Sequence, residues 1–126
     1  MADIWRGRTY HIQSGTEANP NKKHLFIVLS EPDTDGLVLA VSLTSTIKTD
    51  KTCIIDIGED PFITKKSYVA YNFLEIMKTS FFHSEESNRD TDASEHLLEK
   101  ICDGITKSDF VKPQYLKFYK KNRNNS

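Results

Sequence analysis

The chain is poor in cysteine and has no long apolar run. Its two cysteines, Cys53 and Cys102, form neither a CxxC pair nor a Cys/His spacing typical of a zinc site. They do not make a disulfide framework, and a reducing compartment fits this composition. No window approaches the roughly 18 consecutive apolar residues that a membrane span needs, and the N-terminus has no apolar signal core. We therefore expect a soluble, cytoplasmic protein without a membrane partner.

The common catalytic motifs are also missing. The chain has no Gly-rich phosphate loop, no GxSxG elbow, no HExxH helix and no paired carboxylates at a fixed spacing. We expect no cofactor and no bound metal. Two weaker alternatives stay open: Cys53 as a nucleophile beside His24 or His11, and a metal site built from His11, His24, Asp56 and Asp60.

The length and charge of the chain predict one small domain with polar segments outside its core. The 126 residues are 37% hydrophobic and 28% charged, which predicts a small core in a single domain, 1–126. Residues 81–106 carry seven acids against two bases, and residues 107–126 carry six bases against one acid. We divide the chain into a barrel at about 4–80, an acidic loop and helix at about 81–106, and a basic segment at 107–126. The basic segment is either a solvated tail or a patch for nucleic acid or an acidic partner.

The best-defined secondary structure lies in residues 24–71. Four apolar, β-branched or aromatic runs occur at 24–30, 36–45, 52–57 and 67–71, separated by turn-forming residues. A further strand is predicted around residues 9–12. The fold class is therefore mainly β with C-terminal helices, namely a small barrel of about five to six strands with one or two helices packed on it.

The C-terminal half is more mixed. Residues 72–80 fit a short helix or an irregular closing segment, and residues 83–91 are polar and expected to be mobile. A capping box beginning at Asp92 predicts a helix over about 93–103, because an apolar stripe follows it at helical spacing. Pro113 predicts the start of a second short helix.

A long loop and three potential cations precede the second strand. Residues 14–23 exceed the length that a hairpin needs, and long loops on small barrels often cover a site. Lys22, Lys23 and His24 then lie at the entrance of an apolar strand. This places positive charge at one end of the predicted sheet.

The order of three short motifs resembles that of the PemK/MazF toxin family. Arg6-Gly7 precedes the first strand, a basic residue opens the second, and Leu43-Thr44-Ser45 ends a later strand. The resemblance covers roughly residues 4–76. It implies an SH3-like barrel and a dimeric, metal-independent endoribonuclease that inhibits growth as the toxin of a toxin–antitoxin pair. The main departure is His24, which stands where the family has its catalytic arginine.

The resemblance also implies a site. His24 is suited to act as base or acid in the attack of a 2′-hydroxyl on phosphate, because an unperturbed imidazole titrates near pH 6.5. Thr44, retained from the Leu-Thr-Ser motif, would hydrogen-bond the phosphate, and Lys22 and Lys23 would supply charge. Alternatively, His24 is a strand-end histidine satisfied by backbone or water. The remaining predicted RNA contacts are Ser45, Lys65 and Lys66.

Two functions follow from these patterns. The first is a toxin-like endoribonuclease acting on single-stranded RNA, with a cognate antitoxin as partner and a second copy as a dimer mate. The alternative is a non-catalytic SH3-like module that binds a protein or RNA. The missing family arginine and the charged C-terminal third favour the alternative.

Overall fold

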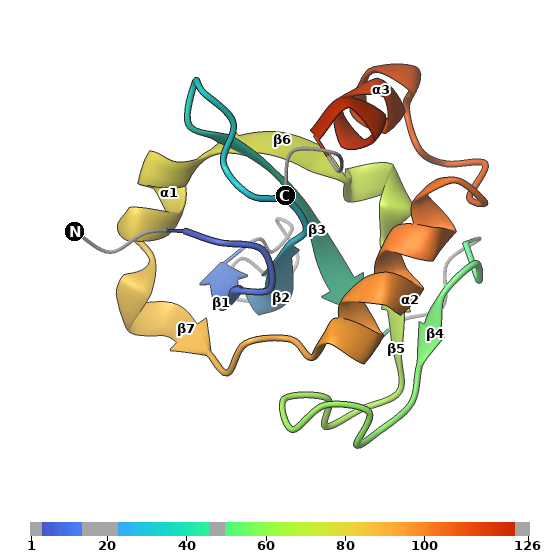
Figure 1. Ribbon diagram of the computed structural model, residues 1–126. Coiled ribbons are helices and arrows are strands. Elements are labelled where there is room, and N and C mark those ends of the chain that lie inside the picture. The colour runs from blue at the N-terminus through green and yellow to red at the C-terminus, as the bar shows by residue number, and fades with distance from the viewer. Residues whose placement is uncertain (1–3, 14–22, 46–49, 123–126) are drawn as a thin grey trace.

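The computed structural model describes residues 4–13, 23–45 and 50–122 and has a mainly β architecture. Its strands form one antiparallel sheet with the order β4-β5-β3-β2-β1-β7, and β6 also pairs with β3. Figure 1 shows the strands and helices curved around a common interior. The strands are β1 (Thr9–Gln13), β2 (Lys23–Val28), β3 (Leu37–Thr44), β4 (Ile54–Ile55), β5 (Ser67–Val69), β6 (Glu75–Lys78) and β7 (Arg89–Asp90).

Strand β3 is the centre of the sheet. It is the longest strand, and six of its eight residues are buried. Ala40 is paired with Val28 of β2 and with Glu75 of β6, so these strands lie on opposite edges of β3. Leu43 is likewise paired with Leu25 of β2 and Val69 of β5. An apolar run with neighbours on both edges and cover on both faces explains the continuous hydrophobicity of this segment.

Alternate residues of the sheet feed two separate cores. Ile27, Val41 and Leu43 belong to the larger core, which also contains the buried face of helix α2 (Glu95–Ile105). The intervening residues, such as Val28 and Ala40, belong to the smaller core with Tyr10, Ile12 and Phe82. This division follows from the two-residue period of a strand.

Three helices and two 3-10 turns complete the described chain. Helix α2 packs its apolar stripe on the larger core, and helix α3 adds half-buried aromatic residues to it. None of the described helices has the length and apolar character that crossing a membrane requires. Besides α2, the helical elements are η1 (Tyr71–Phe73), α1 (Thr79–His83), η2 (Glu86–Asn88) and α3 (Pro113–Asn122).

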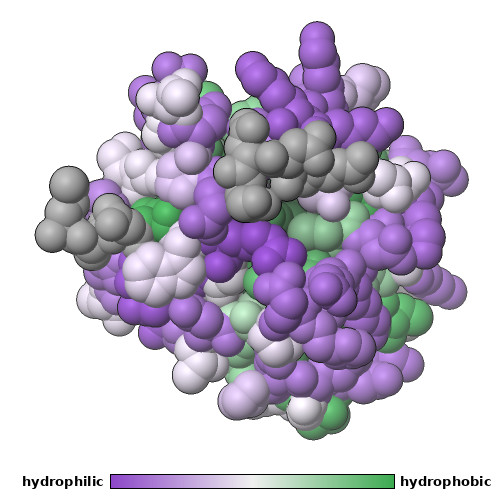
Figure 2. Space-filling model, viewed as in Figure 1, coloured by the Kyte–Doolittle hydropathy of each residue, from purple (hydrophilic) through white to green (hydrophobic). Residues whose placement is uncertain are grey.

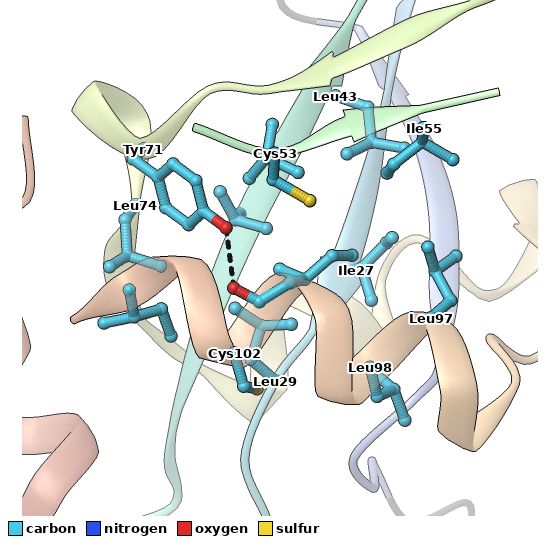
Figure 3. Close-up of a cluster of buried hydrophobic side chains, with 14 of the residues drawn as sticks. Ile27, Leu29, Leu43, Cys53, Ile55, Tyr71, Leu74, Leu97, Leu98 and Cys102 are labelled. Atoms are coloured by element: carbon cyan, nitrogen blue, oxygen red, sulfur yellow. Dashed lines mark hydrogen bonds between the residues drawn. The ribbon is translucent and has the colours of Figure 1, made fainter. Parts of the chain in front are cut away.

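A buried tyrosine joins the sheet to α2. The Tyr71 hydroxyl donates a hydrogen bond of 2.6 Å to the carbonyl oxygen of Ile101 (Figure 3). Gly104, one turn further along α2, leaves the space that the Tyr71 ring occupies. The close approach of ring and helix therefore depends on the absence of a side chain at Gly104.

Part of the acidic charge of residues 81–106 is neutralised within the fold. Arg6 Nη1 lies 2.9 Å from a Glu95 carboxylate oxygen. The nearly buried Arg8 lies 2.8 Å from Glu86 and stacks over Trp5 at 3.9 Å from the ring centre. Arginines from the start of the chain thus compensate acids that are distant in sequence. Figure 2 shows the face viewed in Figure 1 as mostly hydrophilic, with apolar residues in small areas between polar ones.

The predicted mainly β class with C-terminal helices is confirmed, and the count of elements is larger than predicted. The described residues form seven strands, where five to six were predicted, and three helices, where one or two were predicted. Residues 75–78 form β6 and not a helix or irregular closure, because they pair with the free edge of β3. Residues 89–90 form β7 within the stretch predicted to be mobile.

The N-cap of α2 is Ser94, whose hydroxyl accepts a hydrogen bond from the amide of Leu97. The prediction of a capping box beginning at Asp92 was therefore wrong.

We expect Gly104→Ala to destabilise the protein. Within a helix this change normally stabilises by about 1 kcal/mol. Here the new Cβ would collide with the Tyr71 hydroxyl and ring, so the free energy of unfolding should fall by about 1–3 kcal/mol. Denaturant unfolding measures the difference. Glu99→Ala, at an exposed position of the same helix, is the matched control and should change stability by less than about 0.5 kcal/mol. A stabilised Gly104→Ala variant would contradict the packing of Tyr71 on α2.

Candidate functional site

A pocket of about 370 Å³ opens where β1 ends, β2 begins and β3 ends. Because neighbouring strands are antiparallel, these termini meet at the same end of the sheet. The segment between β4 and β5 forms the remaining wall. The lining residues are His11, Lys23, His24, Leu25, Leu43, Thr44, Ser45, Phe62, Ile63, Thr64, Lys65 and Ser67.

Strand register explains which side chains meet in this pocket. His11 is paired with Leu25, and Leu25 with Leu43, so these three lie in one row across the sheet. Leu43 belongs to the larger core and Leu25 packs against it. Directly paired residues point to the same face, so His11 lies on the face of the larger core. The pocket therefore lies at one end of the larger core and shares residues with it.

His24 and Thr44 occupy the next row. The pairing of β2 with β3 ends at Leu25 and Leu43, and His24 and Thr44 are the next residues beyond it on each strand. His24 is paired with Ile12, which belongs to the smaller core. The row of His24 and Thr44 thus belongs to the opposite face of the sheet, and it reaches the pocket at the strand ends.

Five of the seven predicted site residues line this pocket. They are His24, Thr44, Lys23, Ser45 and Lys65. Lys66 is exposed and is not among the lining residues. Lys22 and most of the loop predicted to cover the groove, 14–22, lie outside the described residues.

His11 also lines the pocket, although it is not among the residues predicted to contact RNA. His11 Nε2 lies 2.8 Å from Asp90 Oδ2, and both side chains are partly exposed. The hydrogen bond from His11, together with one from the Thr91 amide, holds the pKa of Asp90 below its usual range. Asp90 is therefore an acceptor, and the Nε2 nitrogen of His11 carries the proton that it donates. One sequence signal for this position was available. In a strand, His11 must face away from its apolar neighbours Tyr10 and Ile12, which belong to the smaller core.

The pocket combines positive charge, hydroxyls and imidazoles. Lys23 and Lys65 contribute ammonium groups, while Thr44, Ser45 and Ser67 contribute hydroxyls. Hydroxyl and ammonium groups donate hydrogen bonds to phosphate oxygens, and imidazole transfers protons near neutral pH. This chemistry is suited to a phosphate ester.

The cysteines lie in the larger core, away from the pocket lining. Burial raises the pKa of Cys53, and burial also raises that of Cys102, although Arg6 opposes the shift. A buried thiol with a raised pKa is a poor nucleophile at neutral pH. Among the described residues, no three His, Cys, Asp or Glu side chains are grouped as a metal site would require.

No protein-family model and no curated protein sequence matches this chain significantly. The resemblance to PemK/MazF toxins therefore remains a prediction from short motifs.

We expect both thiols to resist labelling in the folded protein. Cys53 and Cys102 are free and buried, so a disulfide reagent should react only as the protein unfolds. Absorbance after addition of Ellman's reagent measures the rate, with guanidinium-denatured protein as the control in which both thiols react. Fast labelling of Cys53 in native buffer would restore it as a candidate nucleophile.

Proposed function

We propose that the protein binds single-stranded RNA at the pocket and cleaves it by attack of a ribose 2′-hydroxyl on the adjacent phosphate. The observation that carries this proposal is the convergence of His11, Lys23, His24, Thr44 and Lys65 at one end of the sheet. These residues come from three strands and a loop, and each supplies a group that phosphodiester cleavage needs.

The dimensions of the pocket are suited to part of an RNA strand. A volume of about 370 Å³ is at the small end of the range for ligand pockets, which is roughly 300–1,000 Å³. One nucleotide would fill it, and the neighbouring nucleotides would lie over the rim. Exposed Lys66 and Lys65 follow one another at this rim and would contact the backbone.

The proposed roles follow from chemical type. An imidazole removes the 2′-hydroxyl proton or protonates the leaving 5′-oxygen. The ammonium groups of Lys23 and Lys65 stabilise the negative charge that develops on the phosphate oxygens. Thr44 and Ser45 donate hydrogen bonds to the same oxygens. The products would be a 2′,3′-cyclic phosphate and a 5′-hydroxyl.

The biological setting follows from the family resemblance. An SH3-like toxin of this kind would form a homodimer and would be held inactive by an antitoxin protein. The runner-up is a non-catalytic module, which the substitution of His24 for the family arginine favours. Under that function the pocket would bind RNA or a protein segment without cleaving it.

We expect the purified protein to cleave single-stranded RNA, and His24→Ala to slow cleavage by about a hundredfold to ten-thousandfold. Thr44→Ala should slow it by about tenfold to a hundredfold, the value of one hydrogen bond to a charged group. Gel electrophoresis of a labelled oligonucleotide measures the rate, and mass spectrometry identifies the cyclic phosphate.

His83→Ala is the matched histidine control, because His83 is exposed on α1 and does not line the pocket. It should cleave at the wild-type rate. RNA that is bound but remains intact would support the non-catalytic module. Cleavage that neither His24→Ala nor Thr44→Ala affects would overturn the roles proposed for these residues.

A further inference from the structure

The His11–Asp90 pair joins two segments separated by 79 positions in the sequence. We propose that His11 is the general base of the pocket and that Asp90 positions and orients it. This inference rests on the proposed function and names the group that removes the 2′-hydroxyl proton.

His11 lies on the face of the sheet that forms most of the pocket. Most of the pocket lining comes from the larger-core face, and Leu25 and Leu43 of the His11 row are part of it. His11 is aligned with these residues, whereas His24 is aligned with Ile12 of the smaller core. A substrate seated against Leu25 and Leu43 would therefore meet the His11 ring on its own side of the sheet.

The contact with Asp90 also orients the His11 ring. The Nε2–H group donates to the ionised carboxylate of Asp90 at 2.8 Å, which leaves Nδ1 as the basic nitrogen. A carboxylate bound to one ring nitrogen selects the tautomer, orients the imidazole and stabilises the imidazolium once a proton is gained. Asp90 thus supplies what a histidine base requires.

The pair contributes only modestly to stability. The side chains of His11 and Asp90 are 43% and 33% exposed, so solvent screens their interaction, and ion pairs screened in this way contribute about 0–1 kcal/mol. Strand β7 is already held to β1 by backbone pairing and by the hydrogen bond from the Thr9 hydroxyl to the Thr91 carbonyl. We therefore expect β7 to stay paired with β1 when this ion pair is removed.

The 2′-hydroxyl proton moves to Nδ1 of His11 while the 2′-oxygen forms a bond to phosphorus. The bond from phosphorus to the 5′-oxygen breaks, and the leaving oxygen takes a proton from His24 or from water. The His11 imidazolium then returns its proton to solvent.

The experiment compares His11→Ala, His11→Gln and Asp90→Asn with wild type by single-turnover cleavage of an RNA oligonucleotide. His11→Ala should reduce the rate by about a hundredfold to ten-thousandfold. Added free imidazole should restore part of it, because a diffusible base can occupy the space left by the ring. His11→Gln keeps a donor for Asp90 and tests whether the loss is one of structure.

Asp90→Asn should reduce kcat by about tenfold to a hundredfold and leave KM unchanged, because the carboxylate acts through His11. Binding of a cleavage-resistant 2′-deoxy oligonucleotide should also stay the same in all three variants. Thermal unfolding checks that each variant is folded. His96→Ala, exposed on α2 outside the pocket lining, is the control.

The outcomes separate the two proposals. Wild-type protein that leaves RNA intact overturns the proposed function and the inference with it. Active wild-type protein combined with fully active His11→Ala overturns the inference alone. Loss of activity in His11→Ala without imidazole rescue, together with a lowered melting temperature and an active His11→Gln, would assign His11 a structural role and also overturn it.

Discussion

The register of β2 between β1 and β3 is the constraint on which both the core and the site depend. It aligns His11, Leu25 and Leu43 in one row and places Ile12 beside His24 in the next. A slip of β2 by one residue would turn Leu25 away from the larger core and would place His24 on the same face as His11. Burial of Leu43 and its neighbours therefore stabilises the arrangement of polar groups at the strand ends. The pocket needs no dedicated scaffold, because the hydrophobic pairing that forms the sheet also positions its lining.

The cover of the larger core links this sheet to the C-terminal half. Tyr71 follows β5 and donates its hydroxyl hydrogen bond to α2, while Ser94 caps the start of that helix and its amide donates to buried Asp60. Asp60 lies in the segment between β4 and β5, close in sequence to the pocket residues Phe62 and Ile63. The start of α2 is thus hydrogen-bonded to the segment that forms one wall of the pocket, and a second hydrogen bond, from Tyr71, fixes the helix further along.

Much of the fold was predictable because its central strands are apolar and β-branched. Residues 37–44 need no context to be recognised as a buried strand. The sequence Glu-Ile-Met-Lys of β6 has no such preference, and only the unpaired edge of β3 makes it a strand. The two-residue strand β7 is polar and depends in the same way on β1. The local sequence pattern identifies strands that are strongly apolar. It misses strands that form only because they pair with the edge of a neighbouring strand.

The same distinction applies to the site. Lys23, His24 and Thr44 were predictable because each lies at a strand end that hydrophobicity marks clearly. The contact of Asp90 with His11 was not, because it requires β7 to pair with β1 across most of the chain.

The two imidazoles reach the pocket from opposite faces of one sheet, and this arrangement is suited to the proposed chemistry. Attacking and leaving oxygens lie on opposite sides of phosphorus in an in-line displacement. Side chains from adjacent rows at a strand end would approach a phosphate bound there from two sides of the sheet. The alternation of a β-strand would thus provide the separation that the reaction requires, with Asp90 distinguishing one histidine from the other.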